Sequence, residues 1–264
     1  SADGGGESLG SRGKIDVEIL VRGADEHDFV RTVRFVVFDD ASVSPTLDIN
    51  ELVALGDEER DATRFKTTLE VKTNPDKMLV VVVNEPQVMT SVLNAVIAPE
   101  QLEEMLFRMD DTFSFDHVQP LMSGIPMSGV KRKIVVEENV TTNEKITIER
   151  AVARVELWLK KADEIAFARL STSMNSRVLL ENTYGKGYLV TGTEADKTRF
   201  QTGLEIENNF GYIQTPTSGF EHVIWNYRDA NVLELSDAPQ RICMFYTPER
   251  TYEVADDRNK LFLD

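Results

Sequence analysis

Residues 145–161, with the sequence KITIERAVARVELWLKK, decide how we interpret this chain. Their apolar residues alternate with polar ones, at Ile146 and Ile148 and then at Ala151, Ala153, Val155, Leu157 and Leu159. Such alternation places one face of a β-strand on a core. The phase changes once, at Glu149–Arg150, and a shift of one residue turns every following side chain to the opposite face. We interpret the change as the passage from one β domain to the next; the alternative is one long strand with a mild irregularity.

Short alternating or apolar runs on both sides of this stretch predict further strands. Before it, strands are predicted at 14–21, 29–38, 64–72, 78–83 and 131–138. After it, they are predicted at 165–170, 178–181, 188–191, 222–227, 241–246 and 261–263, the last with little left to pair with. Asn74–Pro75–Asp76 is a turn signal, so 64–72 and 78–83 are expected to form an antiparallel hairpin.

The segment 86–109 departs from the β pattern. Pro99 suits the first turn of a helix and glutamates follow it. The segment also carries an apolar stripe at helical spacing, formed by Leu102, Met105, Leu106 and Met109. We therefore expect one helix, packed on the outside of the N-terminal sandwich, in a fold that is otherwise all-β.

Length and composition fit a soluble protein with one or two domains. The chain has 264 residues, of which 41% are hydrophobic, and a formal net charge of -16. We expect a flexible leader at 1–13, an N-terminal β-sandwich at 14–149, and a C-terminal β-sandwich at 150–264 that lacks its last strands. The leader, SADGGGESLGSRG, is typical of a tether or a trimmed end.

The same numbers exclude several function classes. A nucleic-acid partner requires a basic surface, and this chain is strongly acidic. No run approaches the 18 or so apolar residues of a membrane-spanning helix, and no signal peptide is visible. Cys243 is the only cysteine, so an intrachain disulfide is impossible, and its apolar surroundings indicate a buried, inert thiol.

No motif predicts catalysis, a cofactor or a metal. The three histidines are scattered, and neither a nucleophile elbow nor a phosphate-binding loop is present. We therefore expect a protein that is not an enzyme. Trp158 and Trp225 are candidates for stacking on a sugar, although we favour packing between domains for Trp158. Trp225 is left as the candidate ligand contact.

Several motifs in a fixed order resemble one known family. They are VRFVVFDD (33–40), MLVVVVNEP (78–86), IPMSG (125–129), IERAVARVEL (148–157) and MFYTPER (244–250). Together they resemble the fimbrillins, the type V pilins of Bacteroidales and their accessory subunits, over roughly residues 14–260. The resemblance implies two tandem transthyretin-like β-sandwich domains, export as a lipoprotein to the outer membrane, and assembly into surface fimbriae that support cell adhesion.

The resemblance also implies a maturation step. An arginine-specific protease cuts after the first strand, which leaves, and a strand from a neighbouring subunit replaces it by donor-strand exchange. Here the cut would fall at Arg22–Gly23, and the displaced strand would carry Ile15, Val17, Ile19 and Val21. The partners would be other fimbrial subunits, the protease, and a host or bacterial surface ligand. The alternatives are a non-polymerising tip or anchor lipoprotein, or a surface module that binds glycan or protein.

The physics of this step sets a condition on the structure. Removing four apolar side chains from a core costs roughly 6–12 kcal/mol, which is comparable with the whole stability of a domain. We therefore expect the exchangeable strand to have an edge without a bonded partner. If residues 15–21 lie mid-sheet with bonded partners along both edges, the hypothesis of a replaceable first strand is refuted, and the family resemblance falls with it.

Overall fold

Strands make up most of the computed structural model, which describes residues 10–21, 27–55, 64–114, 117–160, 163, 177–181, 185–190, 221–226, 238–248 and 260–263. The strands of the first half are β1 (Arg12–Val21), β2 (Thr32–Asp39), β3 (Thr46–Ala54), β4 (Arg64–Lys72), β5 (Asn74–Val83), β6 (Leu106–Arg108), β7 (Met127–Val136) and β8 (Thr141–Arg150). Those of the second half are β9 (Val152–Leu159), β10 (Arg177–Glu181), β11 (Lys186–Tyr188), β12 (Glu221–Asn226), β13 (Gln240–Pro248) and β14 (Lys260–Leu263). The mostly-β class predicted from alternation is confirmed.

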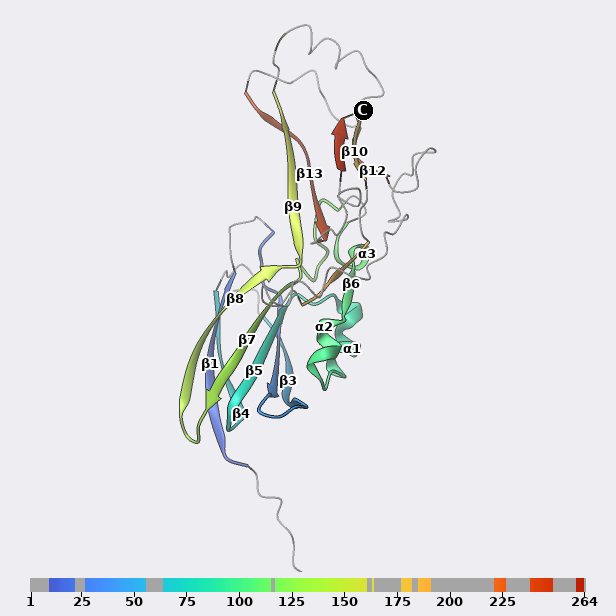
Figure 1. Cartoon of the computed structure of the whole chain (residues 1–264). Helices are drawn as coiled ribbons and strands as arrows, with labels where there is room; N and C mark the ends of the chain where they lie inside the picture. Colours follow the sequence, from blue (N-terminus) through green and yellow to red (C-terminus); the bar gives the residue numbers. More distant parts are fainter. Residues whose placement is uncertain are drawn as a thin grey trace, which may run out of the picture.

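Seven strands form one curved sheet in the order β3-β2-β5-β7-β8-β1-β4. β7 and β8 pair at Met127↔Arg150 and Ser128↔Glu149 and diverge beyond these residues. The sheet therefore folds into two facing layers, β3-β2-β5-β7 and β8-β1-β4 (Figure 1). The backbone N–H of Lys72 on β4 donates to Asp48 Oδ2 on β3 at 2.9 Å, which joins the two edge strands. The curved sheet is thus a near-barrel.

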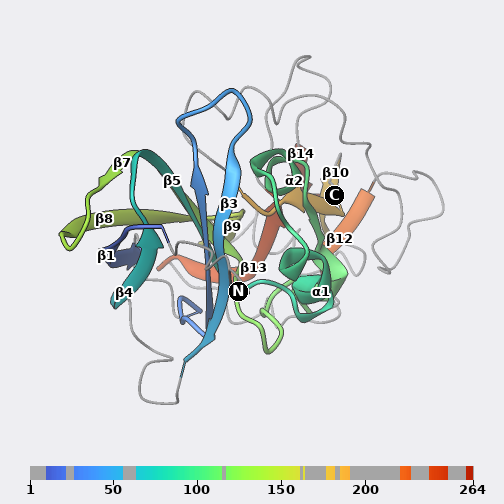
Figure 2. The ribbon, with the colours of Figure 1, turned by 90° about the horizontal axis from the view of Figure 1, so that it is seen from below.

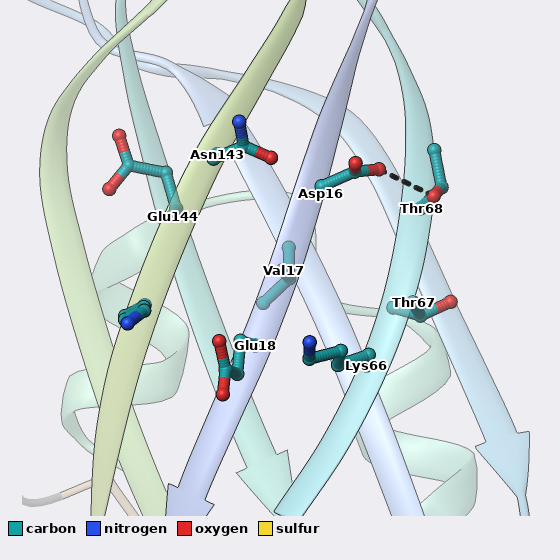
Figure 3. Close-up of a pocket in the computed structure, with 9 residues that line it drawn as sticks. Asp16, Val17, Glu18, Lys66, Thr67, Thr68, Asn143 and Glu144 are labelled. Atoms are coloured by element: carbon teal, nitrogen blue, oxygen red, sulfur yellow. Dashed lines mark hydrogen bonds between the residues drawn. The ribbon is translucent and has the colours of Figure 1, made fainter.

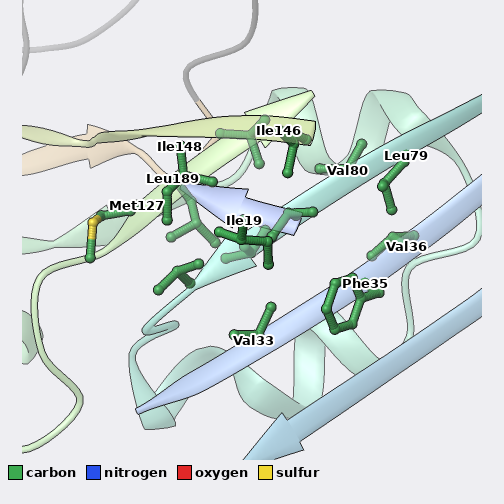
Figure 4. Close-up of a cluster of buried hydrophobic side chains, with 14 of the residues drawn as sticks. Ile19, Val33, Phe35, Val36, Leu79, Val80, Met127, Ile146, Ile148 and Leu189 are labelled. Carbon is green, nitrogen blue, oxygen red and sulfur yellow. The ribbon is translucent and has the colours of Figure 1, made fainter. Parts of the chain in front are cut away.

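The core lies between these two layers. Ile15, Val17 and Ile19 of β1 are buried there, and Phe35 of β2 and Leu79 of β5 face them from the other layer. Figure 4 shows such side chains gathered between the strands. The valine-rich part of β5 is buried on both faces, as its unbroken apolar sequence predicts.

A helical segment covers the outer side of the β3-β2-β5-β7 layer, opposite β1 and β4 (Figure 2). The single helix expected at 86–109 is wrong. The structure instead has a 3-10 turn (Gln87–Met89), α1 (Thr90–Asn94), α2 (Pro99–Glu103) and, after β6, α3 (Met109–Thr112). Pro99 begins a new helix rather than continuing α1, and Leu106–Arg108 leaves the helical stripe to pair with β11.

The expected hairpin of 64–72 with 78–83 is also wrong. β4 pairs with β1, whereas β5 pairs with β2 and β7, so the two strands lie in different layers. Asn74 does make the local hydrogen bond that is typical of a turn, because its Oδ1 accepts from the N–H of Asp76 at 2.9 Å. Both residues nevertheless belong to β5 and do not form a hairpin turn. The link at Thr73 carries the chain from one layer to the other.

The passage between sheets at Glu149–Arg150 is confirmed. β8 ends at Arg150 in the seven-stranded sheet, and β9 begins at Val152 and pairs with β13. Between them the N–H of Ala151 donates to Pro126 O at 2.9 Å. The boundary between two domains at this point, and their transthyretin-like arrangement, stay predictions.

The described strands of the second half form small sheets. β9 pairs with β13, β12-β10-β14 form a three-stranded sheet, and β11 pairs with β6 of the first half. The expectation that a strand at 261–263 has little to pair with is wrong, because β14 pairs with β10 from Val178↔Leu263 to Glu181↔Lys260. The strand predicted at 165–170 lies outside the described residues.

Candidate assembly site: the slot of the first strand

β1 lies in the middle of a sheet with a bonded partner along each edge. It pairs antiparallel with β4 from Arg12↔Lys72 to Leu20↔Arg64, and parallel with β8 from Lys14↔Thr141 to Val21↔Ile148. The expectation of an edge without a partner is therefore wrong, and the condition set from the sequence for rejecting a freely replaceable first strand is met. The family resemblance, which was tied to the same condition, is decided instead by the fold. β4 is the edge strand of this layer, because it is the last strand in the sheet order and pairs within the sheet only with β1. We call the space that β1 occupies between β4 and β8 the β1 slot.

The inward face of β1 is apolar and almost completely enclosed. Ile15 is 0% exposed, and Val17 and Ile19 are 1% exposed. Val21, the fourth residue of the predicted face, is only partly buried where the strand ends. Three enclosed side chains at about 1.5–3 kcal/mol each hold β1 with roughly 5–9 kcal/mol of apolar burial.

The start of β1 is fixed by a glycine. A Cβ on Gly13 would lie 2.5 Å from Glu137 O and 2.6 Å from Val136 Cγ1, so the backbone passes closer to the β7–β8 turn than a side chain allows. On either side of it, the N–H of Lys14 donates to Val140 O and the N–H of Asn139 donates to Arg12 O, both at 3.1 Å. The predicted leader at 1–13 is therefore too long by two residues, because Arg12 and Gly13 already belong to the strand.

The outward face of β1 lines a shallow polar hollow of about 620 Å³ (Figure 3). Thr68 Oγ1 of β4 donates to Asp16 Oδ1 at 2.5 Å, and Glu18 forms an ion pair with Arg64. The rest of the lining comes from the three strands of this layer and includes Lys66, Asn143, Glu144 and Lys145. Carboxylates and ammonium groups both line the hollow, and the Asp16–Thr68 and Glu18–Arg64 contacts join β1 to β4.

Among the described residues, no group of three or more His, Cys, Asp and Glu side chains is placed to hold a metal ion. In the same part of the chain, no helix has the length and apolar character that crossing a bilayer requires. The candidate site that we consider further is the β1 slot, which is occupied by the predicted residues of the first strand.

No family model and no curated protein matches the chain. Solved structures do match. The tip fimbrial protein Mfa3 from Porphyromonas gingivalis, with a C-terminal truncation, matches at a TM-score of 0.58 and 15% identity, over 96% of this chain and 77% of that one. The chain has the fold of Bacteroidales fimbrial proteins.

Two further structures support this fimbrial fold. A candidate cell adhesion protein from Bacteroides eggerthii matches at a TM-score of 0.61 and 12% identity, over 96% of this chain and 74% of that one. A fimbrial assembly protein from Parabacteroides distasonis matches at a TM-score of 0.50 and 10% identity, over 96% and 81%. The resemblance that the sequence motifs indicate is thus confirmed by structural neighbours.

The remaining predicted site residues are placed as follows. Arg22 and Gly23, the predicted cut site, lie outside the described residues and stay a prediction. The backbone of Trp225 lies in β12 opposite Val178, and its side chain is outside the described part, so its role as a ligand contact also stays a prediction. Packing between domains is wrong for Trp158, which is 52% exposed.

Trp158 instead belongs to a polar cluster on the β9–β13 ribbon. Its Nε1 donates to Glu156 Oε2 at 3.0 Å, and Glu156 Oε1 also accepts from Arg154 and, at 3.2 Å, from Arg241. The hydrogen bonds from Arg154 and then from Trp158 lower the pKa of Glu156 below its ordinary value.

Two charged side chains that were not predicted from the sequence are buried in the fold. Arg34 on β2 is 0% exposed and makes a bidentate ion pair with Glu85, with Nε–Oε2 at 2.6 Å and Nη2–Oε1 at 2.8 Å. Lys77 on β5 is also 0% exposed and lies between Asp39 and Asp48. The sequence does carry a signal for these two buried cations: Arg34 lies inside an apolar run, and Lys77 directly precedes one.

Proposed function

We propose that this chain is a structural subunit of a bacterial surface fimbria that supports adhesion, and that its subunits join by donor-strand exchange at the β1 slot. Export as a lipoprotein to the outer membrane, partner subunits, and an arginine-specific protease belong to the same proposal. The shared fold with proteins described as fimbrial or adhesive supports it, although their functions are their own.

The observation that carries the proposal is the position of β1 as the first strand of the chain within an enclosed slot. The segment between Val21 and Thr32 connects β1 to the rest of the described fold. A cut in this segment, for which Arg22 is our candidate, would leave β1 held by hydrogen bonds and apolar contacts alone. If β1 then left, β4 and β8 would both offer open edges to a strand from another subunit.

Pairing along both edges changes the expected mechanism. A strand with roughly 5–9 kcal/mol of apolar burial and two ladders of hydrogen bonds does not leave spontaneously, since the emptied domain would approach the limit of its stability. The cut alone should therefore leave β1 in its slot. We infer that an incoming strand must compete for the slot residue by residue, forming pairs with β4 and β8 as β1 loses them.

The test is limited digestion of the folded full-length chain with an arginine-specific protease. We expect cleavage after Arg22, retention of the β1 peptide under native mass spectrometry, and slow formation of higher oligomers by the cut chain only. Arg22→Gln should abolish the cut and the oligomers together. Arg31→Gln, which changes a nearby arginine outside the candidate site, should alter neither.

The outcomes separate the subunit role from its alternative. Oligomers that form equally well from uncut protein would refute exchange of β1. A cut chain that keeps its own β1 and stays monomeric would favour a non-polymerising tip or anchor subunit. That second candidate has specific support, because Mfa3 is described as a tip fimbrial protein and β1 here is bonded along both edges.

A further inference from the structure

A fully buried lysine lies between two carboxylates at the end of the near-barrel. Lys77 is 0% exposed, and its Nζ lies 2.5 Å from Asp39 Oδ1 and 2.7 Å from Asp48 Oδ2. The Asp48 side chain is 2% exposed and the Asp39 side chain is 20% exposed. The single positive charge of Lys77 can neutralise only one of the two carboxylates, so the cluster of three side chains has one carboxyl group in excess.

Irregularities of the sheet bring the three side chains together. Asp39 lies directly opposite Lys77 in the β2–β5 ladder. Asp48 lies at a β-bulge in β3, because the β2–β3 register shifts between Val37↔Ile49 and Phe38↔Leu47. The β5–β7 ladder also shifts on both sides of Lys77. Bulges re-aim side chains and are frequent beside reactive sites, so the arrangement is consistent with a chemical use of these groups.

We propose that Lys77 and Asp48 form an intramolecular amide bond, with Asp39 as the group that moves the protons. Separated charges are costly in an enclosed site, and an ion pair recovers that cost only with favourable geometry. An amide bond removes one positive and one negative charge at once. This inference concerns the covalent structure of the subunit and does not depend on the proposed fimbrial function.

The step needs no external reagent. Proton transfer from the Lys77 ammonium to the Asp48 carboxylate gives a neutral amine beside a neutral acid. The amine nitrogen attacks Asp48 Cγ, an N–C bond forms, and Asp39 accepts a proton from that nitrogen. Asp39 then returns the proton to the departing hydroxyl group, the C–O bond breaks, and one water leaves. The products are the amide and water, and Asp39 ends as it began.

Two features of the structure favour Asp48 as the electrophile. The backbone N–H of Lys72 already donates to Asp48 Oδ2 at 2.9 Å, and a preset N–H donor stabilises the negative charge that develops on that oxygen in the tetrahedral intermediate. The amine is held within hydrogen-bond distance of the same carboxyl group in a closed space, which raises its effective concentration strongly. Asp39 is more exposed and can exchange its proton with solvent.

The bond would join β3 to β5 across β2 and close the chain from Asp48 to Lys77 into a loop that includes β4. This layer faces β1 across the core. The cross-link would therefore hold one wall of the near-barrel together while the β1 slot lies in the other wall.

The test is the intact mass of the purified full-length chain under denaturing conditions, followed by peptide mapping with tandem mass spectrometry. We expect a mass lower than the sequence mass by one water per chain, and one branched peptide that joins the segments containing Lys77 and Asp48. Lys131 and Glu144 form a more exposed ion pair with an N···O distance of 3.7 Å and are the internal control, which should stay unlinked.

Three variants test the assigned roles. Asp48→Asn should lose ammonia instead of water, since the amide nitrogen then leaves. Asp39→Asn, which keeps the shape of the side chain, should retain its full sequence mass. Lys77→Arg keeps the charge but removes the amine and should also retain its sequence mass.

Three results would overturn the proposal. The wild-type chain could show its full sequence mass after prolonged incubation of the folded protein. The lost water could map to a succinimide or another residue pair, including Lys77 with Asp39. A branched Lys77–Asp48 peptide in the Asp39→Asn variant at the wild-type level would remove Asp39 from the mechanism.

Discussion

Replacing Ile19 with alanine tests whether β1 is packed as the structure has it. Ile19 is 1% exposed and lies with Val33 and Ile146 in the core between the layers (Figure 4). The substitution removes three carbons, worth about 0.8 kcal/mol each in transfer from water, or roughly 2.4 kcal/mol. The cavity left behind adds to this, so we expect a loss of about 3–5 kcal/mol in the free energy of unfolding. The chain should still fold, because a domain of this kind has about 5–15 kcal/mol.

The assay is urea-induced unfolding followed by circular dichroism, with the midpoint and the slope compared between variants. A lower midpoint at constant slope reports a change in stability. Lys14→Ala is the matched control, since Lys14 is an exposed residue of the same strand, and we expect a change within about 0.5 kcal/mol. If Ile19→Ala cost less than about 1 kcal/mol at unchanged slope, the enclosed packing of β1 would be refuted.

Three further predictions concern other parts of the described structure. Gly13→Ala should reduce the free energy of unfolding by about 1–3 kcal/mol, because its Cβ would lie 2.5 Å from Glu137 O. Calorimetry should show this as a lower melting temperature, and an unchanged melting temperature would contradict the contact. Arg34→Met should cost about 3–5 kcal/mol in urea unfolding because it leaves the buried Glu85 without its ion-pair partner, whereas Arg64→Met, at an arginine side chain that is 58% exposed, should cost under about 1 kcal/mol. The pKa of Glu156 is lowered in the folded chain, so its stabilising contribution is present above the unfolded pKa and is lost as the pH falls through the folded pKa. Trp158→Phe should move that pKa back toward its ordinary value in an NMR titration of the carboxyl carbon, and no movement would exclude the indole hydrogen bond as a cause.

Alternation predicted the strands well because it is a local property of the sequence. β1, β4 and the passage from β8 to β9 each follow a period of two, and the structure has strands at these places. The change of phase at Glu149–Arg150 coincides with a change of sheet, because β8 ends at Arg150 in the seven-stranded sheet and β9 pairs with β13. These features needed no knowledge of distant residues.

Pairing could not be predicted in the same way. β4 and β5 are adjacent in sequence and separated by a turn signal, yet they lie in different layers. A hairpin and a crossing between layers can share the same short, polar link. The outcome depends on which other strands pair with each of the two. Here β4 pairs with β1 and β5 pairs with β2.

The inward face of β1 was predicted from the sequence, but the strands that pair with its edges were not. The inward residues Ile15, Val17 and Ile19 are buried as the alternation indicated. Alternation reports the two faces of a strand and carries no information about its two edges, so the partners β4 and β8 could not be inferred. The buried cations Arg34 and Lys77 were visible as charges in apolar runs, but their carboxylate partners come from other strands.

Pairing along both edges bears directly on what could drive the proposed exchange. A donor strand that fills the same slot gains nearly the same burial and the same two ladders that β1 loses, so the swap itself is close to neutral. While β1 is covalently attached, its effective concentration at the slot is in the millimolar range or above, which a strand from a dilute neighbour cannot match. After a cut behind Val21, β1 becomes a free peptide that is diluted once displaced, whereas a donor strand stays tethered to a folded subunit. In the proposed assembly, proteolysis therefore acts on the connection of β1 rather than on its contacts, and a strand bonded on both sides is compatible with exchange only if that connection is cut first.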